Sequence, residues 1–234
     1  MNFAQRSYQL ELLDGDNIPF PDIQQNLREL DVINRWLGGH RMSIRGLQQL
    51  LGGRKQIHIC EIGCGGGDNL LALLQWCRRR DISVTFTGID INAACIEYAA
   101  RSADLQPLTN WITNDYRKVS FTDKPDIIFS SLFCHHFTEE VLVSQLQWMQ
   151  EHSAAGFFIN DLHRHWLPYH AIRLLTRMFS RSYLLKNDAP LSVSRGFLKT
   201  EWDELFQQAG ISPYQVSWQW AFRYLIIFKH HDGR

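Results

Sequence analysis

The fold of this chain is decided by one stretch, Ile57-His58-Ile59-Cys60-Glu61-Ile62-Gly63-Cys64-Gly65-Gly66-Gly67-Asp68. The apolar residues 57–60 predict a buried strand, and the leucine-rich residues 70–77 predict a helix with a broad apolar surface. Between them lies a turn whose glycines accept φ/ψ values that other residues avoid. Such a turn presents bare backbone and free helix N–H groups, so it predicts a ligand site.

A second strand supports this interpretation. Residues 84–89 are β-branched and aromatic, and they end in Asp90. An acid that ends the second strand, roughly 20 residues beyond the glycine turn, binds ribose hydroxyls in Rossmann-like sites. A dinucleotide fingerprint would also need a glycine at position 68, but the chain has Asp68, which is awkward for a pyrophosphate.

The run from Glu61 to Asp68 resembles the first motif of class I S-adenosylmethionine-dependent methyltransferases, in which an acid and any residue precede Gly-x-Gly-x-Gly. The resemblance implies that Glu61, Gly63, Gly65 and Asp68 hold the methionine portion of the cofactor, with Cys64 in the same turn close to the ligand. S-adenosylhomocysteine would be the product. A structural glycine turn in another α/β domain is the alternative.

The resemblance also assigns residues at the ends of later strands. It implies that Asp90 binds the cofactor ribose, that Ile91 packs on the adenine, and that Asn114 and Asp115 match the position that binds the adenine amino group. A turn formed by the Asn-Asp pair explains those two residues equally well. Ser131, near the end of the fourth predicted strand, completes the expected cofactor site.

The remaining sequence predicts an alternating order of strands and helices. Strands are expected at residues 108–113, 125–132 and 157–161, and helices at 93–103, 141–149 and from Thr200 to Gly210. Two final strands, near residues 214–218 and 222–228, have no helix between them and should pair antiparallel. The fold class is therefore α/β: a Rossmann-like, seven-stranded, mostly parallel sheet with helices on both faces and a C-terminal antiparallel hairpin. The methyltransferase resemblance covers about residues 56–229.

Two segments fall outside this core. Residues 1–51 predict a helical, locally acidic N-terminal extension, broken at Gly38-Gly39, and residues 52–234 form the predicted methyltransferase domain. An insertion at about residues 163–187 contains no acid, and its Arg173, Arg177 and Arg181 recur every four residues. We interpret the two segments as a lid that meets over the pocket, the alternative being two independently solvated faces.

Composition excludes several other classes. The formal net charge of zero provides no bulk field toward nucleic acid. We expect a cytoplasmic protein, because the sequence shows neither a signal-peptide pattern nor an apolar run near the ~18 residues of a membrane span. Five cysteines without a Cys-x-x-Cys pair argue against both a disulfide framework and a zinc site.

Histidines follow two predicted strands at the edge where ligands bind. A phenol has a pKa near ~10, so a histidine can act as the base in its methylation. His136 and His163 are the preferred candidates, followed by His135. The His163-x-His165 pair lacks further ligands beyond Asp161, so no metal is expected.

The predicted acceptor is a small molecule. Ser130-Ser131-Leu132-Phe133 replaces the Asn-Pro-Pro-Tyr sequence of amino-methylating enzymes, and the run resembles small-molecule methyltransferases of the ubiquinone and menaquinone type. We expect methylation of a phenol, quinol or polyketide, on oxygen rather than carbon, by a monomer or homodimer. Alternatives are an inactive cofactor-binding regulatory protein and, less favoured, a nucleotide-dependent oxidoreductase. The aromatic residues expected to line the acceptor pocket are Phe133, Phe137, Trp166, Tyr169, Phe179 and Tyr183.

Overall fold

The computed structural model describes residues 3–15 and 18–230 and contains one seven-stranded sheet. The strand order is β3-β2-β1-β4-β5-β7-β6, and only β7 runs antiparallel to its neighbours. This topology confirms the predicted fold class. The strands are β1 (Gln56–Ile62), β2 (Ser83–Asp90), β3 (Thr109–Thr113), β4 (Ile127–Ser131), β5 (Gly156–Leu162), β6 (Tyr214–Gln219) and β7 (Arg223–Lys229).

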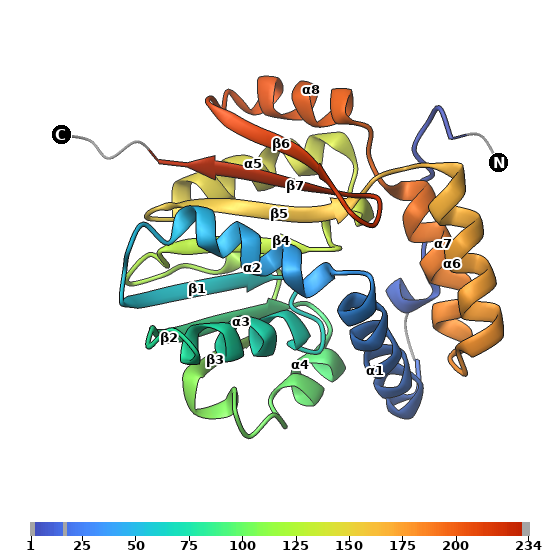
Figure 1. Ribbon diagram of the computed structural model, residues 1–234, viewed down its shortest axis with the longest axis horizontal. Helices are drawn as coiled ribbons and strands as arrows, with labels where there is room; N and C mark the ends of the chain where they lie inside the picture. The colour runs from blue at the N-terminus through green and yellow to red at the C-terminus, as the bar shows by residue number, and fades with distance from the viewer. Residues whose placement is uncertain (1–2, 16–17, 231–234) are drawn as a thin grey trace.

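Helices cover both faces of the sheet, as Figure 1 shows. On one face, α2 (Gly39–Leu50) and α3 (Asp68–Arg78) form an apolar cluster with strand side chains of one parity. On the other, α5 (Glu139–His152) and α8 (Lys199–Ala209) pack on side chains of the opposite parity. Because alternate residues of a strand point to opposite faces, a strand buried on both sides favours consecutive apolar residues, which explains Ile127-Ile128-Phe129 in the fully buried β4.

The glycine turn connects β1 to α3 in the way the sequence predicts. Gly63, Gly65 and Gly67 have φ values of 67°, 50° and 75°, in the left-handed region that favours glycine. A Cβ at Gly63 would lie 2.1 Å from a ring carbon of Phe133. The turn therefore needs glycine both for its backbone conformation and for close packing against the end of β4.

A separate helical layer stands beyond the carboxyl ends of the parallel strands (Figure 1). It consists of α1 (Phe20–Trp36), α6 (Trp166–Phe179) and α7 (Tyr183–Arg195), with the short α4 (Ala93–Ala99) beside α1. Short 3₁₀ segments lie at Leu12–Asp14, Gln106–Leu108, Tyr116–Lys118 and Cys134–His136. None of the described helices combines the length and apolar character that a membrane span requires.

Three boundaries differ from the sequence-based expectations. The insertion holds two helices and extends to Arg195 rather than ending near residue 187. Helix α8 begins at Lys199 and not after a Thr200 cap, because the Glu201 carboxylate accepts the Leu198 N–H at 2.6 Å and pairs with buried Arg164. Residues 3–11 are not helical, since their backbone groups bond instead to α7, as in Ser7 N–H to the Ser194 carbonyl.

Candidate functional site

A cavity of about 1160 Å³ lies between the carboxyl edge of the sheet and the helical layer. Its polar side is formed by the glycine turn, by residues at and after the ends of β2 and β4, and by Arg223. Its other side is apolar and comes from the N-terminal segment, α1, α6 and α7. The apolar lining consists of Leu10, Leu13, Ile18, Ile23, Leu27, Leu30, Ile33, Leu37, Leu167, Pro168, Ala171, Ile172, Leu175, Leu185, Ala189 and Val193.

Asp90 fixes the glycine turn at the polar side. One of its carboxylate oxygens accepts the Gly65 N–H and the other accepts the Asn92 N–H, both at 2.8 Å. Burial raises the pKa of this carboxyl above its ordinary value. Cys64 and Ile91 also line the cavity beside it, so the turn, its aspartate and the residue after β2 face one space.

Two buried side chains beside the turn keep polar atoms that have no partner among the described residues. Glu61 has an unpaired carboxyl oxygen, and burial followed by the charges of Asp68 and Asp90 raises its pKa well above the ordinary value. Arg223 is 3% exposed and leaves Nε and Nη1 unpaired, while Nη2 donates to Asn34 Oδ1 at 3.1 Å. Both line the cavity. An orphan carboxyl and an orphan guanidinium in one wall are suited to a zwitterionic ligand group.

Asp68, the first residue of α3, stays ionised. It pairs with His40 Nε2 at 2.8 Å and accepts from Asn34 Nδ2 at 3.2 Å. Burial would raise the pKa of this carboxyl, but the bonds from His40 and Asn34 outweigh burial and lower it. Asn34 thus links Asp68 to Arg223 and holds the guanidinium at the cavity wall.

His135 is the centre of a buried ion-pair chain. Its Nδ1 lies 2.8 Å from Asp161, its Nε2 lies 3.5 Å from Glu11, and its side chain is 2% exposed. Burial alone would lower the pKa of His135, but the Asp161 and Glu11 charges outweigh it and raise the pKa to about 9. His135 is therefore an imidazolium at neutral pH, with both ring nitrogens engaged, and it is unsuited to act as a base.

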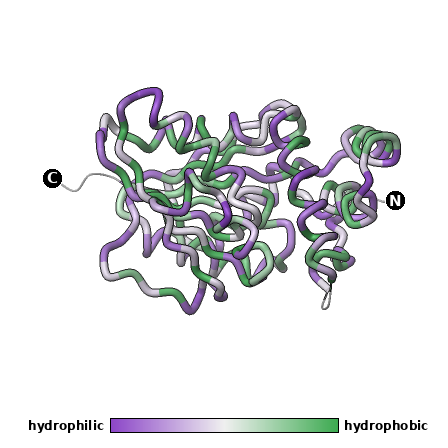
Figure 2. Tube along the Cα trace, turned by 90° about the horizontal axis from the view of Figure 1, so that it is seen from below, coloured by the Kyte–Doolittle hydropathy of each residue, from purple (hydrophilic) through white to green (hydrophobic). Residues whose placement is uncertain are grey.

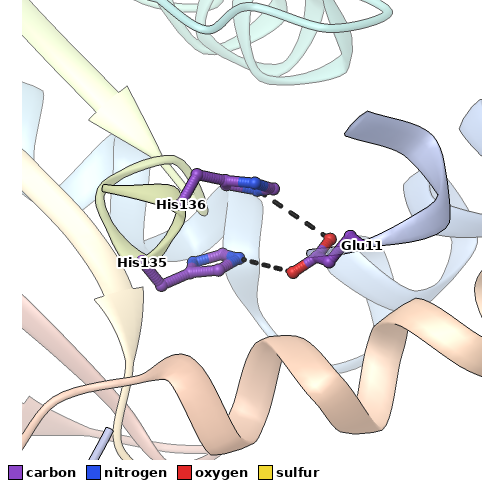
Figure 3. A group of neighbouring side chains, drawn as sticks. All are labelled: Glu11, His135 and His136. Atoms are coloured by element: carbon purple, nitrogen blue, oxygen red, sulfur yellow. Dashed lines mark ion pairs between the residues drawn. The ribbon is translucent and has the colours of Figure 1, made fainter. Parts of the chain in front are cut away.

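His136 is arranged differently. Its Nδ1 lies 3.2 Å from Asp14, and its Nε2 is 3.9 Å from Glu11, too long for a hydrogen bond (Figure 3). The side chain is partly exposed and lines the cavity. With Nδ1–H donated to Asp14, Nε2 keeps a lone pair that can accept a proton from a ligand.

Arginines hold this histidine turn in place. Arg195 donates from Nε to the His135 carbonyl at 3.0 Å and from Nη2 to the His136 carbonyl at 2.9 Å. Arg6 adds a bond from Nη2 to the Phe137 carbonyl at 3.0 Å. The sequence interpretation missed these arginines together with Glu11 and Asp14, because no local motif connects the N-terminus or α7 to the end of β4.

Several predicted site residues lie elsewhere. His163 does not line the cavity: Trp218 donates to its Nδ1 at 3.2 Å, and burial lowers its pKa. Asn114 and Asp115 do not line the cavity either. The Asp115 carboxylate accepts hydrogen bonds from the Arg117 side chain and caps the 3₁₀ turn that follows it. The cofactor candidates that do line the cavity are Glu61, Gly63, Cys64, Gly65, Asp68, Asp90, Ile91 and Ser131.

Of the six aromatic residues predicted to line the acceptor pocket, two line the cavity. Phe133 and Phe137 line the cavity, with ring centroids 4.8 Å apart. Trp166, Phe179 and Tyr183 are exposed on or beside α6, and Tyr169 is also outside the lining. Three of these residues lie on α6 and Tyr183 begins α7, but the side chains of the two helices that line the cavity are mainly aliphatic.

The N-terminal segment and the α6–α7 insertion meet over the cavity, although not by the expected charge stripe. Glu29 accepts hydrogen bonds from Ser180 and from the Arg181 N–H, and Asp188 accepts the Leu12 N–H at 2.8 Å. The guanidinium groups of Arg173, Arg177 and Arg181 form no ion pair within the described part of the chain. Carboxylates bonded to backbone N–H groups connect the two segments instead.

Two carboxylate and histidine groups also have spacing that suits a metal ion. Their ligand atoms lie within 4.8 Å of one another in each group. One contains Glu11, His135 and His136 (Figure 3), and the other contains Asp31, His40 and Asp68. Proton transfer to or from His136 can use the carboxylates of Glu11 and Asp14 beside its ring, and it does not depend on a metal ion at either group.

The raised pKa of His135 should make stability depend on pH. The folded protein holds this proton more tightly than the unfolded chain, whose histidines titrate near 6.5. We expect the free energy of unfolding to be highest below pH 6.5 and to fall by up to about 3 kcal/mol as pH rises through 9. Urea unfolding at pH 6.5 and 9.5 measures the change. His135→Gln should abolish most of this fall in the free energy of unfolding, whereas the exposed control His170→Gln should keep it. The same pH dependence in the wild type and both variants would contradict the ion-pair assignment.

Comparisons with known proteins agree with this geometry. Residues 59–156 match the family model for a methyltransferase domain. A search of curated protein sequences gives no significant match. Among solved structures, the plantazolicin methyltransferase BpumL in complex with SAH is 17% identical, with a TM-score of 0.66 and 90% of each chain covered.

Two further structures share the fold. Magnesium protoporphyrin IX methyltransferase from Synechocystis PCC 6803 with bound SAH is 14% identical, with a TM-score of 0.52 over 93% of this chain and 90% of that one. Human N-acetylserotonin methyltransferase with SAM is 14% identical, with a TM-score of 0.61 over 89% of this chain and 56% of the human one. The matching domain, the strand order and the glycine turn agree: residues 59–156 match a methyltransferase domain, and the chain has the fold of class I S-adenosylmethionine-dependent methyltransferases.

Proposed function

We propose that this protein methylates a hydroxyl group of a small aromatic or lipid-like molecule. The observation that carries the proposal is the single cavity that joins three parts. These are the glycine turn with Asp90, the open nitrogen of His136, and a wide apolar wall. A charged methyl donor and an apolar acceptor can therefore lie in one enclosed space, next to a group that takes a proton.

The polar side fits the cofactor residue by residue. When bound, S-adenosylmethionine supplies an electrophilic methyl group on a sulfonium. Glu61 would pair with the ammonium of its methionine part and Arg223 with the carboxylate, which gives both orphan groups a partner. Asp90 would receive the ribose hydroxyls and Ile91 would contact the adenine, while Ser131 lines the same cavity at the end of β4.

His136 and its carboxylate partners would perform the proton chemistry. Nε2 would take the acceptor's hydroxyl proton as the acceptor oxygen receives the methyl group. Asp14 holds Nδ1–H and stabilises the resulting imidazolium. Glu11 lies near the same ring, so the positive charge forms where two carboxylates already stand. His135 acts as a positioning residue, because its buried ion pairs hold Glu11.

The apolar wall supports the acceptor class. Aliphatic side chains of α1, α6 and α7 and the rings of Phe133 and Phe137 would bind rings or chains rather than charged polymers. Structural neighbours named for plantazolicin and magnesium protoporphyrin IX support a small-molecule acceptor. The zero net charge offers no attraction to nucleic acid. All five cysteines are buried and free, which supports a reducing cytoplasmic location.

We further propose that the N-terminal extension and α6–α7 act as a lid. They enclose the acceptor end of the cavity, and their mutual bonds converge on Glu29 and Asp188. Closing over the sulfonium would exclude water and bury an apolar acceptor.

Arg223→Met should weaken binding of S-adenosylhomocysteine by about 10- to 100-fold, because the ligand carboxylate loses its charged partner. Methylthioadenosine lacks the amino-acid part and should bind both proteins equally. Calorimetric titration of the two ligands measures the difference. A parallel loss for both, or no loss for either, would show that the arginine does not face the methionine carboxylate.

His136→Gln should lower turnover by ~100-fold or more and leave cofactor affinity unchanged, because only the proton acceptor is lost. The measurement uses labelled S-adenosylmethionine with a panel of phenols, quinols and polyketides. His163→Gln is the matched control and should keep the full rate, since His163 lies outside the cavity. Chelator treatment should also leave the rate unchanged; loss of activity with chelator would reassign Glu11, His135 and His136 to a metal. Transfer to carbon alone, or to none of the panel, would contradict the proposed reaction.

Glu29→Ala should raise the acceptor KM several-fold with little change in cofactor affinity, because the backbone N–H groups between α6 and α7 lose their acceptor. Steady-state kinetics with the acceptor varied, alongside titration of S-adenosylhomocysteine, separates the two effects. Glu151→Ala on α5 removes an exposed carboxylate away from the cavity and serves as control. Unchanged KM in the Glu29 variant would remove the basis for the lid.

A further inference from the structure

One exposed face of α6 is apolar along its whole length. Leu167, Ala171, Leu174 and Met178 recur at intervals of four, three and four residues, so they lie in one stripe on the helix. All four are exposed, with Leu174 at 59% and Met178 at 64%. The buried side of the helix contains Ile172 and Thr176 and packs against the rest of the protein. Leu167 and Ala171 also line the cavity, so the stripe begins at the cavity mouth. Leu174 and Met178 do not line it and form the outward part of the stripe.

Basic residues of the helix itself flank this stripe. Arg173 and Arg177 are exposed beside it, and Arg181 and Lys186 continue the positive charge past the end of the helix. No Asp or Glu occurs between Asp161 and Asp188, although the chain as a whole carries 24 acidic and 24 basic residues. In Figure 2 the helical layer alternates between hydrophobic and hydrophilic positions along its trace. A basic amphipathic surface of this kind is typical of helices that lie in a membrane interface.

Tryptophans extend the same surface toward the cavity mouth. Trp166, Trp218 and Trp220 are each half or more exposed. Their ring neighbours connect them: Trp166 lies against His165, which stacks on Phe222, and Trp218 meets Phe222 edge-on. Trp220 and Phe222 also line the cavity. Tryptophan favours the boundary between headgroups and acyl chains, where one part of the ring is wet and the other apolar.

We propose that α6 and its tryptophan neighbours bind the surface of an anionic phospholipid bilayer. Charge complementarity selects this occupant, because exposed Arg173 and Arg177 lie beside the stripe and neither guanidinium forms an ion pair within the described part of the chain. A second copy paired through the same face would bring Arg173 and Arg177 near their own equivalents, a like-charge arrangement that opposes a symmetric dimer. The helix lies on the membrane and does not cross it.

The orientation gives the cavity a direct route to lipid. Leu167, Pro168 and Leu175 line the cavity from the same helix whose outer face meets the bilayer. A lipid-like acceptor can thus pass from the membrane into the apolar chamber without entering bulk water. This consequence rests on the proposed function, but the binding itself needs neither acceptor nor cofactor.

Flotation of the full-length protein with vesicles tests the proposal. We expect binding to phosphatidylglycerol-containing vesicles, little binding to pure phosphatidylcholine, and weaker binding as salt increases. Arg173→Glu/Arg177→Glu should reduce affinity about tenfold or more, since two attractive charges become repulsive. Lys55→Glu/Arg79→Glu makes the same change in net charge at exposed positions near the opposite edge of the sheet, and it should bind normally.

A second pair of variants tests the apolar part. Leu174→Ser/Met178→Ser should weaken binding at low and high salt alike, while Val32→Ser, an exposed site on α1, should not. Titration with S-adenosylhomocysteine confirms that each variant is folded. Absent flotation, equal binding by the arginine or leucine variants, or a salt-stable dimer that these variants dissociate would overturn the membrane assignment. A protein that floats but methylates nothing on the panel would refute the proposed reaction and leave the docking surface standing.

Discussion

The ion pair between His135 and Asp161 is the interaction on which the candidate site depends. Asp161 is fully buried and also accepts the backbone N–H groups of Cys134 and Leu162, at 2.8 and 2.7 Å. Burial would raise the pKa of this carboxyl, but the His135 charge and the hydrogen bonds outweigh burial and lower it. A buried carboxylate and imidazolium are tolerated because each has several partners; removing one would leave the other charge unpaired at a cost of about 3–5 kcal/mol. The end of β5 is thereby locked to the turn after β4.

From this pair the N-terminal segment acquires its position. Glu11 approaches the free side of His135, and Asp14 approaches His136. Arg195 connects the same turn to α7 and to the Gln9 carbonyl. Residues with little helical structure of their own therefore become a wall of the cavity, and the base candidate receives its orienting carboxylate from more than a hundred residues away in sequence. Placement of the acceptor end is a tertiary property.

This explains which parts the sequence could predict. The strand order and the glycine turn follow from local patterns, because period, β-branching and glycine spacing act within a few residues. Asp90 and Ser131 both line the cavity, because parallel strands bring their carboxyl ends to one edge of the sheet. His163 was a candidate by the same rule, but β7 and Trp218 cover it, and antiparallel neighbours are not visible in a strand-end argument. Arg223, Glu11 and Asp14 have no local signature at all. The nearest thing to a clue is that Arg223 stands directly before five apolar or aromatic residues of β7, where a charged side chain is unusual.

The unpaired groups at the polar side have an energetic consequence. Glu61 and Arg223 are buried without full hydrogen bonding among the described residues, and each such group destabilises a folded protein by about 1–3 kcal/mol. Burial lowers the pKa of Arg223 to about 10, so at neutral pH the guanidinium remains charged despite its surroundings. Asn34, which also bonds to Asp68, accepts one hydrogen bond from the Arg223 guanidinium, but Nε and Nη1 of Arg223 keep no partner among the described residues. A zwitterionic ligand would relieve both groups at once, which couples cofactor binding to the stability of the fold. The residues that make the empty protein less stable are thus the residues that make the proposed cofactor fit.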